Sequence, residues 1–116
     1  MKSIQGTKTE QNLLKAFAGE SQARNRYTLF AQKAKEEGYE QIMGIFAETA
    51  EQELAHATRF FKFMQGGMVS ITAEYPAGRI GNTAENLLEA AEGEKLEWSA
   101  LYNDFESVAI LSLIHI

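Results

Sequence analysis

Apolar residues recur every three or four positions along three long stretches of this sequence, approximately residues 8–37, 39–65 and 83–109. This period is that of an amphipathic α-helix. Because only Gly38 separates the first two patterns, we expect an antiparallel helical hairpin whose apolar faces meet. The periodicity therefore predicts an all-α bundle with three long helices.

Capping signals mark the expected ends of these helices. Thr7 with Glu10, and Asn82 with Glu85, have the spacing of a capping box, in which both side chains bond to backbone N–H groups at the helix start. The pair Gly66-Gly67 is expected to end the second helix, because glycine readily adopts the left-handed backbone that follows a helix.

Residues 68–81 lack helical periodicity and hold the only proline, Pro76. The second predicted helix is about 40 Å long at roughly 1.5 Å per residue, and about 14 extended residues reach roughly 46 Å. The segment can therefore run back along the bundle, as the long crossover of ferritin-like bundles does. An independent β-hairpin over Val69–Tyr75 is the alternative.

Two polar residues interrupt the apolar face of the second predicted helix. Glu53 and His56 occupy positions where the period requires core side chains. An unpaired carboxylate in an apolar seam costs several kcal/mol, which is comparable with much of the net stability of a small domain. A metal ion would compensate that cost.

Acidic residues occupy equivalent positions on the other two predicted helices. Glu20 falls on the apolar face of the first, and Glu94 falls on that of the third, with Glu97 one turn away. For Glu20 alone, an ion pair with Arg24 four residues later is the alternative. The recurrence on three helices favours a shared metal site.

The chemistry of these residue types narrows the choice of metal ion. A Glu-x-x-His pair places a carboxylate and an imidazole about one helical turn apart, so both can reach one centre. Di-iron and di-manganese carboxylate proteins use two such helices and one glutamate from each of two others. The sequence has no cysteine, which excludes thiolate zinc sites, iron–sulfur centres and disulfides. Iron or manganese is therefore favoured.

The composition of the chain excludes some classes of binding partner. A chain of 116 residues forms one domain at most, and a net charge of −5 without a basic cluster argues against binding to nucleic acid or anionic membranes. No apolar run approaches the roughly 18 residues of a membrane span, and the polar N-terminus is unlike a signal peptide. We expect a cytoplasmic protein that binds neither nucleic acid nor membrane.

Three motifs together resemble successive motifs of the rubrerythrin family, namely residues 17–27 (FAGESQARNRY), 53–57 (ELAHA) and 92–98 (EGEKLEW). The resemblance covers about residues 2–109. It implies a ferritin-like four-helix bundle around a di-iron site, usually followed by a cysteine-rich rubredoxin domain. It also implies reduction of hydrogen peroxide to water, with electrons from a rubredoxin-type donor.

The resemblance also implies roles for individual residues. Two Fe ions, for which Mn or Zn could substitute, would be held by five ligands: Glu20, Glu53, His56, Glu94 and Glu97. Glu53, Glu97 and Tyr27 are the implied catalytic residues, with protons delivered by carboxylates. Tyr27 and Tyr102 match aromatic positions whose hydroxyl groups would lie beside the cluster.

The sequence departs from the family pattern near Ile110. Ser112 and His115 do not reproduce a second Glu-x-x-His pair, and no rubredoxin cysteines are present. We therefore expect residues 1–109 to be a partial ferritin-like domain, truncated before the fourth helix, and residues 110–116 to be an atypical, foreign tail. A homodimer of two hairpins would supply the missing ligands, and swapping of the third helix into the bundle of a partner chain is the alternative route to a homodimer.

The sequence leaves three functional hypotheses open. The favoured one is a rubrerythrin-type di-iron peroxidase that serves in oxidative-stress defence. The first alternative is a non-catalytic iron-handling bundle, and the second is a metal-free helical fragment that dimerises.

Overall fold

The computed structural model of the chain describes residues 3–92. Three helical segments occur in that range: α1 (Lys8–Glu36), α2 (Glu40–Lys62) and a third that spans residues 83–92. No strand forms between residues 3 and 92, so the all-α prediction is confirmed there and the alternative hairpin over Val69–Tyr75 is not observed. The predicted continuation of the third helix to residue 109, and the tail 110–116, lie outside the described residues.

The start of α1 is fixed by the predicted capping pair. The Thr7 hydroxyl accepts a hydrogen bond from the Glu10 N–H at 3.2 Å, and the Glu10 carboxylate accepts from the N–H of Gly6 at 2.9 Å. The helix ends at Glu36, one residue before the predicted end. Gly38 follows with φ +85°, a conformation that favours glycine and turns the chain into α2.

The end of α2 lies three residues before the predicted end, at Lys62 instead of Gln65. The N–H of Phe63 bonds to the carbonyl oxygen of Phe60 at 3.2 Å, so the final turn tightens to the three-residue pattern that often closes an α-helix. Gln65 leaves the helix, and its side-chain oxygen accepts a hydrogen bond from the Ser3 hydroxyl at 3.0 Å. This contact ties the end of α2 to the start of the chain.

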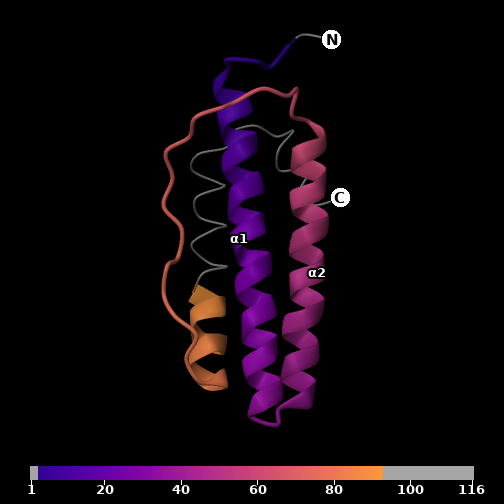
Figure 1. Cartoon of the computed structure of the whole chain (residues 1–116), viewed down its shortest axis with the longest axis vertical. Helices are drawn as coiled ribbons and strands as arrows, with labels where there is room; N and C mark the ends of the chain where they lie inside the picture. The colour runs from indigo at the N-terminus through magenta and orange to yellow at the C-terminus, as the bar shows by residue number, and fades with distance from the viewer. Residues whose placement is uncertain (1–2, 93–116) are drawn as a thin grey trace.

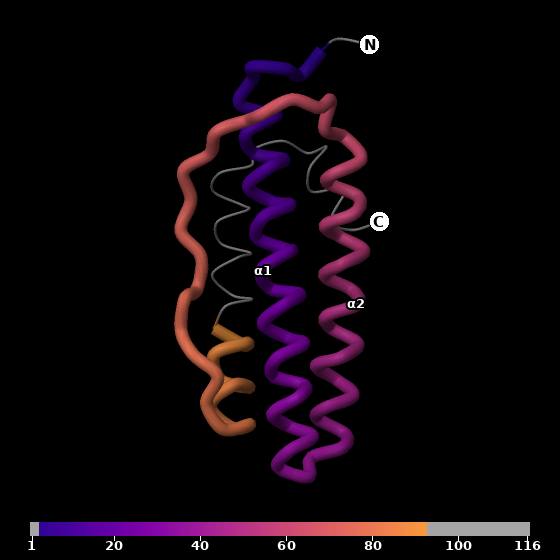
Figure 2. The backbone as a smooth tube through the Cα atoms, in the orientation of Figure 1, coloured from indigo at the N-terminus to yellow at the C-terminus, as the bar shows by residue number. Residues whose placement is uncertain are grey.

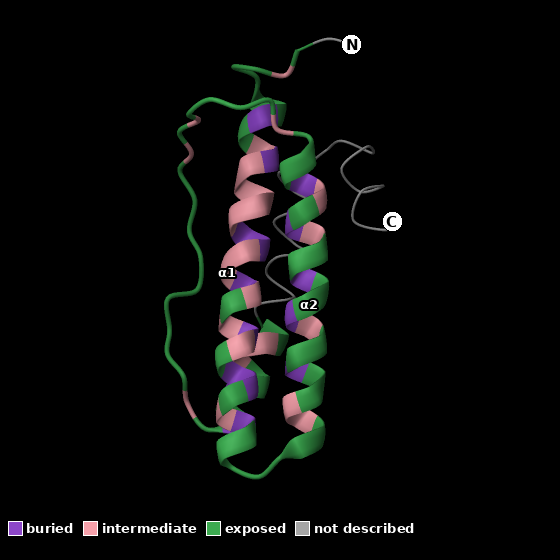
Figure 3. Cartoon of the chain, turned by 45° about the vertical axis from the view of Figure 1, so that its right-hand side comes forward, coloured by how far each residue is buried: buried purple, intermediate pink, exposed green. Residues whose placement is uncertain are grey.

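The two long helices pack side by side as an antiparallel hairpin (Figure 1), and their buried residues face each other (Figure 3). The apolar cluster nearer the hairpin turn comprises Ala23, Tyr27, Phe30, Ala31, Ala34, Phe46 and Ala50. The cluster nearer the other end comprises Leu13 and Phe60, packed against Ile4, Ala16, Phe17 and Met64. The hairpin therefore buries two separate apolar layers.

The segment between α2 and the third helix runs back alongside α1 to the neighbourhood of the hairpin turn (Figures 1 and 2). The predicted long crossover is confirmed. The Tyr75 hydroxyl donates a hydrogen bond to the carbonyl oxygen of Lys15 at 2.8 Å, which attaches the crossover to α1. Ala90 of the third segment then packs against the cluster nearer the turn. None of the helices within residues 3–92 combines the length and apolar character needed to cross a membrane.

The third helical segment begins with a complete capping box. The N–H of Glu85 donates to Asn82 Oδ1 at 2.8 Å, and the N–H of Asn82 donates to Glu85 Oε1 at 3.0 Å, as predicted. A second anchor was not predicted: Glu37 Oε1 accepts hydrogen bonds from both the hydroxyl and the N–H of Thr83, each at 2.6 Å. Because these donors stabilise the carboxylate, they lower the pKa of Glu37 below its ordinary value of 4.5.

The lowered pKa of Glu37 predicts a pH-dependent attachment of the third helix. The stabilisation is present in full above pH 4.5, the ordinary pKa, and is lost as the pH falls through the lower pKa of the folded protein. We expect Glu37→Gln to speed hydrogen exchange at the Thr83 amide at pH 6, because the neutral amide is a weaker acceptor. The difference from wild type should shrink in acid. Glu36→Gln is the matched control, and equal exchange in both variants would contradict the assignment.

Candidate metal centre

Three side chains from the two long helices meet at one level of the hairpin. Glu20 comes from α1, and Glu53 and His56 come from α2. One ligand atom from each lies within 4.8 Å of the others. Glu20 and His56 are each 18 residues from Gly38, so an antiparallel hairpin with equal rise in both helices brings them to the same height.

This polar group forms a layer between the two apolar clusters. On α1, Glu20 lies between buried Leu13 of one cluster and buried Ala23 of the other. On α2, Glu53 and His56 likewise lie between Ala50 of the cluster nearer the turn and Phe60 of the other cluster. Apolar side chains therefore limit access of water along the helix axes, and Glu20 and Glu53 as whole residues are 9% and 6% exposed.

The distances in the cluster fit a shared ion better than direct hydrogen bonds. His56 Nδ1 lies 3.6 Å from Glu20 Oε2 and 4.0 Å from Glu53 Oε2. A hydrogen bond would need about 2.7–3.2 Å. Ligand atoms each about 2.1 Å from a common ion lie about 3.0–3.4 Å apart, so small side-chain shifts would suffice.

The donor set has the chemistry of a cation site. Two buried carboxylates and one imidazole provide oxygen and nitrogen ligands of the kind that iron and manganese accept. Glu20 Oε2 is buried and has no hydrogen-bond partner among residues 3–92. Because a buried carboxylate oxygen is costly without compensation, these residues fit a bound metal ion.

The structure brings together three of the five predicted ligands. No further histidine, aspartate or glutamate from the described part of the chain joins Glu20, Glu53 and His56. The other two predicted ligands, Glu94 and Glu97, lie outside the described residues. The assignment of all five as ligands stays a prediction.

The predicted catalytic tyrosine lies in the apolar cluster nearer the turn. Tyr27 is 2% exposed, and its ring centroid lies 6.2 Å from those of both Phe30 and Phe46. The Arg26 guanidinium lies over the same ring, 5.6 Å from its centroid. Packing on three sides fixes the ring, whereas its catalytic role stays a prediction. Tyr102 and the predicted catalytic Glu97 lie outside the described residues.

The alternative pairing of Glu20 with Arg24 is not observed. The Glu20 carboxylate instead approaches His56. Among the described residues, the hydrogen bond of the Arg24 side chain is a long one, from Nη1 to Asn25 Oδ1 at 3.4 Å. The sequence singled out the correct acid but not its nearest partner in the fold.

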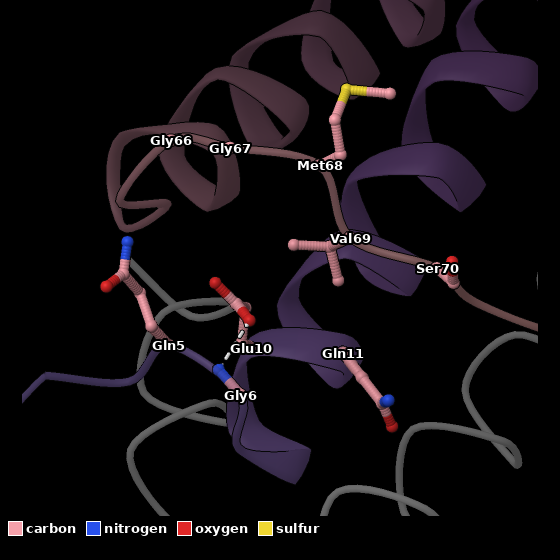
Figure 4. A pocket seen from close by; sticks show the side chains of 9 residues that line it. All are labelled: Gln5, Gly6, Glu10, Gln11, Gly66, Gly67, Met68, Val69 and Ser70. Atoms are coloured by element: carbon pink, nitrogen blue, oxygen red, sulfur yellow. Dashed lines mark hydrogen bonds between the residues drawn. The ribbon is translucent and has the colours of Figure 1, made fainter.

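A separate cavity of about 370 Å³ lies between the N-terminal segment and the turn after α2 (Figure 4). None of the three clustered residues lines it. Its one carboxylate, that of Glu10, accepts the hydrogen bond from the Gly6 N–H that caps α1. The cavity therefore lies apart from the candidate metal centre.

Comparison with known proteins gives the family. A protein-family model described as Rubrerythrin matches residues 11–110. The chain belongs to the rubrerythrin family. It is 66% identical over 108 residues to a rubrerythrin of Porphyromonas gingivalis, which covers 93% of this chain and 54% of that relative. A rubrerythrin of Nitratidesulfovibrio vulgaris is 53% identical over 109 residues, or 94% of this chain and 57% of the relative.

Family membership supports the fold and the general type of centre. A nigerythrin of Nitratidesulfovibrio vulgaris is a more distant relative, 38% identical over 100 residues, which are 84% of this chain and 48% of that protein. The chain spans about half the length of these curated relatives. The all-α arrangement with its long crossover is that of a ferritin-like helical bundle, and the relatives support a di-iron protein of the rubrerythrin type.

Removal of a clustered side chain should strongly weaken metal binding. We expect Glu53→Ala and His56→Ala each to weaken binding of Fe²⁺ at least about 100-fold, because loss of a ligand exceeds the 10- to 100-fold loss typical of outer-shell changes. Elemental analysis after removal of loosely bound ions measures the retained metal. Glu51→Ala, an exposed acid on α2, is the control and should keep wild-type metal content. Equal retention in all three variants would rule out this centre.

Proposed function

We propose that this chain is the di-iron part of a rubrerythrin-type peroxidase that reduces hydrogen peroxide to water. The observation that supports the proposal most strongly is the buried cluster of Glu20, Glu53 and His56 in a member of the rubrerythrin family. When bound, a pair of iron ions supplies electrons to the peroxide. The overall reaction takes up two protons and two electrons for each peroxide and releases two water molecules.

The residues of the chain itself would contribute position, charge and protons. Glu20 and Glu53 bring two negative charges into an apolar interface, and so favour a multiply charged cation there. His56 presents Nδ1 to both carboxylates, which leaves Nε2 to face away from them. We assign proton delivery to carboxylates of the site, with Glu53 and Glu97 as the candidates. We assign to the Tyr27 hydroxyl the role of a hydrogen-bonding group at the site.

The partial exposure of the cluster would allow a small oxidant to reach it. The His56 side chain is 38% exposed, whereas those of Glu20 and Glu53 are 12% and 8% exposed. The imidazole therefore stands at the open side of the layer, and the carboxylates stand at its closed side. Hydrogen peroxide is small and uncharged, so no basic binding patch would be needed to attract it.

Peroxide consumption by iron-loaded protein tests the proposal. With two Fe²⁺ per site under anaerobic conditions, wild type should consume one peroxide for every two bound Fe²⁺. With a reduced rubredoxin as electron donor, it should turn over repeatedly. His56→Ala should lose at least about 100-fold in rate, because iron is held poorly. Glu51→Ala should match wild type. Iron-loaded protein that consumes peroxide no faster than Fe²⁺ in buffer would contradict a peroxidase and favour iron handling.

A homodimer is the second part of the proposal. The described hairpin supplies two carboxylates and one imidazole, so two hairpins related by a two-fold axis would supply four carboxylates and two imidazoles. Exchange of the third helix between chains is another route to a dimer. We expect light scattering to give twice the 12.9 kDa chain mass. A monomer that retains two bound iron ions per chain would contradict the dimer.

A further inference from the structure

Arg24 lies on the same face of α1 as Glu20, four residues later, and both carry an unsatisfied buried atom. Arg24 Nε and Glu20 Oε2 are each shielded from solvent and have no hydrogen-bond partner among the described residues. One atom is an obligate donor and the other is an acceptor. Their spacing, with the acid before the base, is the favourable order for a helical ion pair.

The Glu20 carboxylate thus has two partners within reach but contacts only one. In the structure it turns across the hairpin, with Oε2 at 3.6 Å from His56 Nδ1. That arrangement suits a metal ion but leaves the Arg24 Nε–H without an acceptor within residues 3–92. A rotation of the Glu20 side chain along α1 would pair the two groups and withdraw one carboxylate from the cluster.

We propose that Arg24 is a positioning residue that competes with the metal ion for the Glu20 carboxylate. This inference rests on the proposed metal site. Without metal, part of the population holds Glu20 along the helix on Arg24, which relieves repulsion between the Glu20 and Glu53 carboxylates. With metal, Glu20 turns inward to the ion. Arg24 therefore lowers metal affinity and lets the site release or exchange an ion without leaving a buried charge unpaired.

Competition between Arg24 and the metal ion predicts that replacement of Arg24 raises metal affinity. Arg24→Leu retains an apolar stem but removes the alternative partner, so metal binding no longer requires that a Glu20–Arg24 pair be broken. We expect Zn²⁺ affinity to rise about 3- to 30-fold. This range lies between the fold-changes that correspond to the free energy of an exposed helical ion pair and to that of a buried hydrogen bond to a charged group. A residue that merely supported the fold would change affinity in the opposite direction.

Arg26 provides a matched control on the same helix. It is half-buried like Arg24, and its Nη1 is also buried without a hydrogen-bond partner in the described range. Its Nε donates to Gln22 Oε1 at 2.8 Å, on a different side of α1, because two residues correspond to about 200° of helical rotation. Arg26→Leu removes the same charge from α1 and should leave Zn²⁺ affinity within about twofold of wild type.

The test is a Zn²⁺ titration of the full chain in competition with a chromophoric chelator, with helix content checked by circular dichroism. Arg24→Leu should bind Zn²⁺ more tightly than both wild type and Arg26→Leu. Arg24→Gln should shift affinity in the same direction and serves if the leucine variant loses helix content. Equal or weaker binding by a folded Arg24 variant, or an equal gain in Arg26→Leu, overturns the inference.

Nuclear magnetic resonance supplies a direct readout at the Arg24 side chain. The Arg24 Nε–H signal should shift when Zn²⁺ is added to wild type, because its acceptor leaves. Metal-free Glu20→Gln should resemble the Zn²⁺-loaded wild type at this signal. An Arg24 signal unchanged by Zn²⁺ overturns the inference while the metal site stands. If wild type does not bind Zn²⁺, both the metal site and the role of Arg24 are overturned. If the Arg24 effect is observed but the iron-loaded protein has no peroxidase activity, only the enzymatic proposal is overturned.

Discussion

Burial of two carboxylates inside an apolar helical interface is the constraint that the rest of this structure satisfies. Glu20 and Glu53 place two carboxyl groups between layers of Phe, Leu, Tyr and Ala side chains. The cost of such charges is large compared with the net stability of a small domain, so they need a compensating cation or a hydrogen-bonding partner. A metal ion and Arg24 are the two alternative partners that we propose for Glu20.

The hairpin turn brings the carboxylates together. A connection centred on one left-handed glycine, Gly38, leaves little freedom in the relative height of α1 and α2. Residues at equal distance from that turn then face each other, as Glu20 and His56 do. The apolar clusters above and below hold this register, since a shift by one turn would expose Phe30 or Phe46 and separate the polar groups.

Much of the architecture followed from local signals. Helical periodicity, the capping residues Thr7 and Asn82, and the length of the crossover predicted an all-α bundle whose observed ends differ by at most three residues. The anchors between distant segments gave no local signal. Glu37 caps a helix that begins 46 residues later, and Tyr75 bonds to a carbonyl oxygen 60 residues earlier. Such contacts depend on where the crossover lies, which periodicity does not encode.

The sequence by itself determined that glutamates and a histidine occupy core positions of long helices, because a side chain's place on a helix face depends only on its spacing. It also determined the family, through motifs that span most of the chain. Only the tertiary structure decided which groups meet. Glu20 had a favourable local partner in Arg24, yet packing of α1 on α2 turned its carboxylate to His56. Local spacing gives candidate pairs, whereas the packing of helices against each other selects among them.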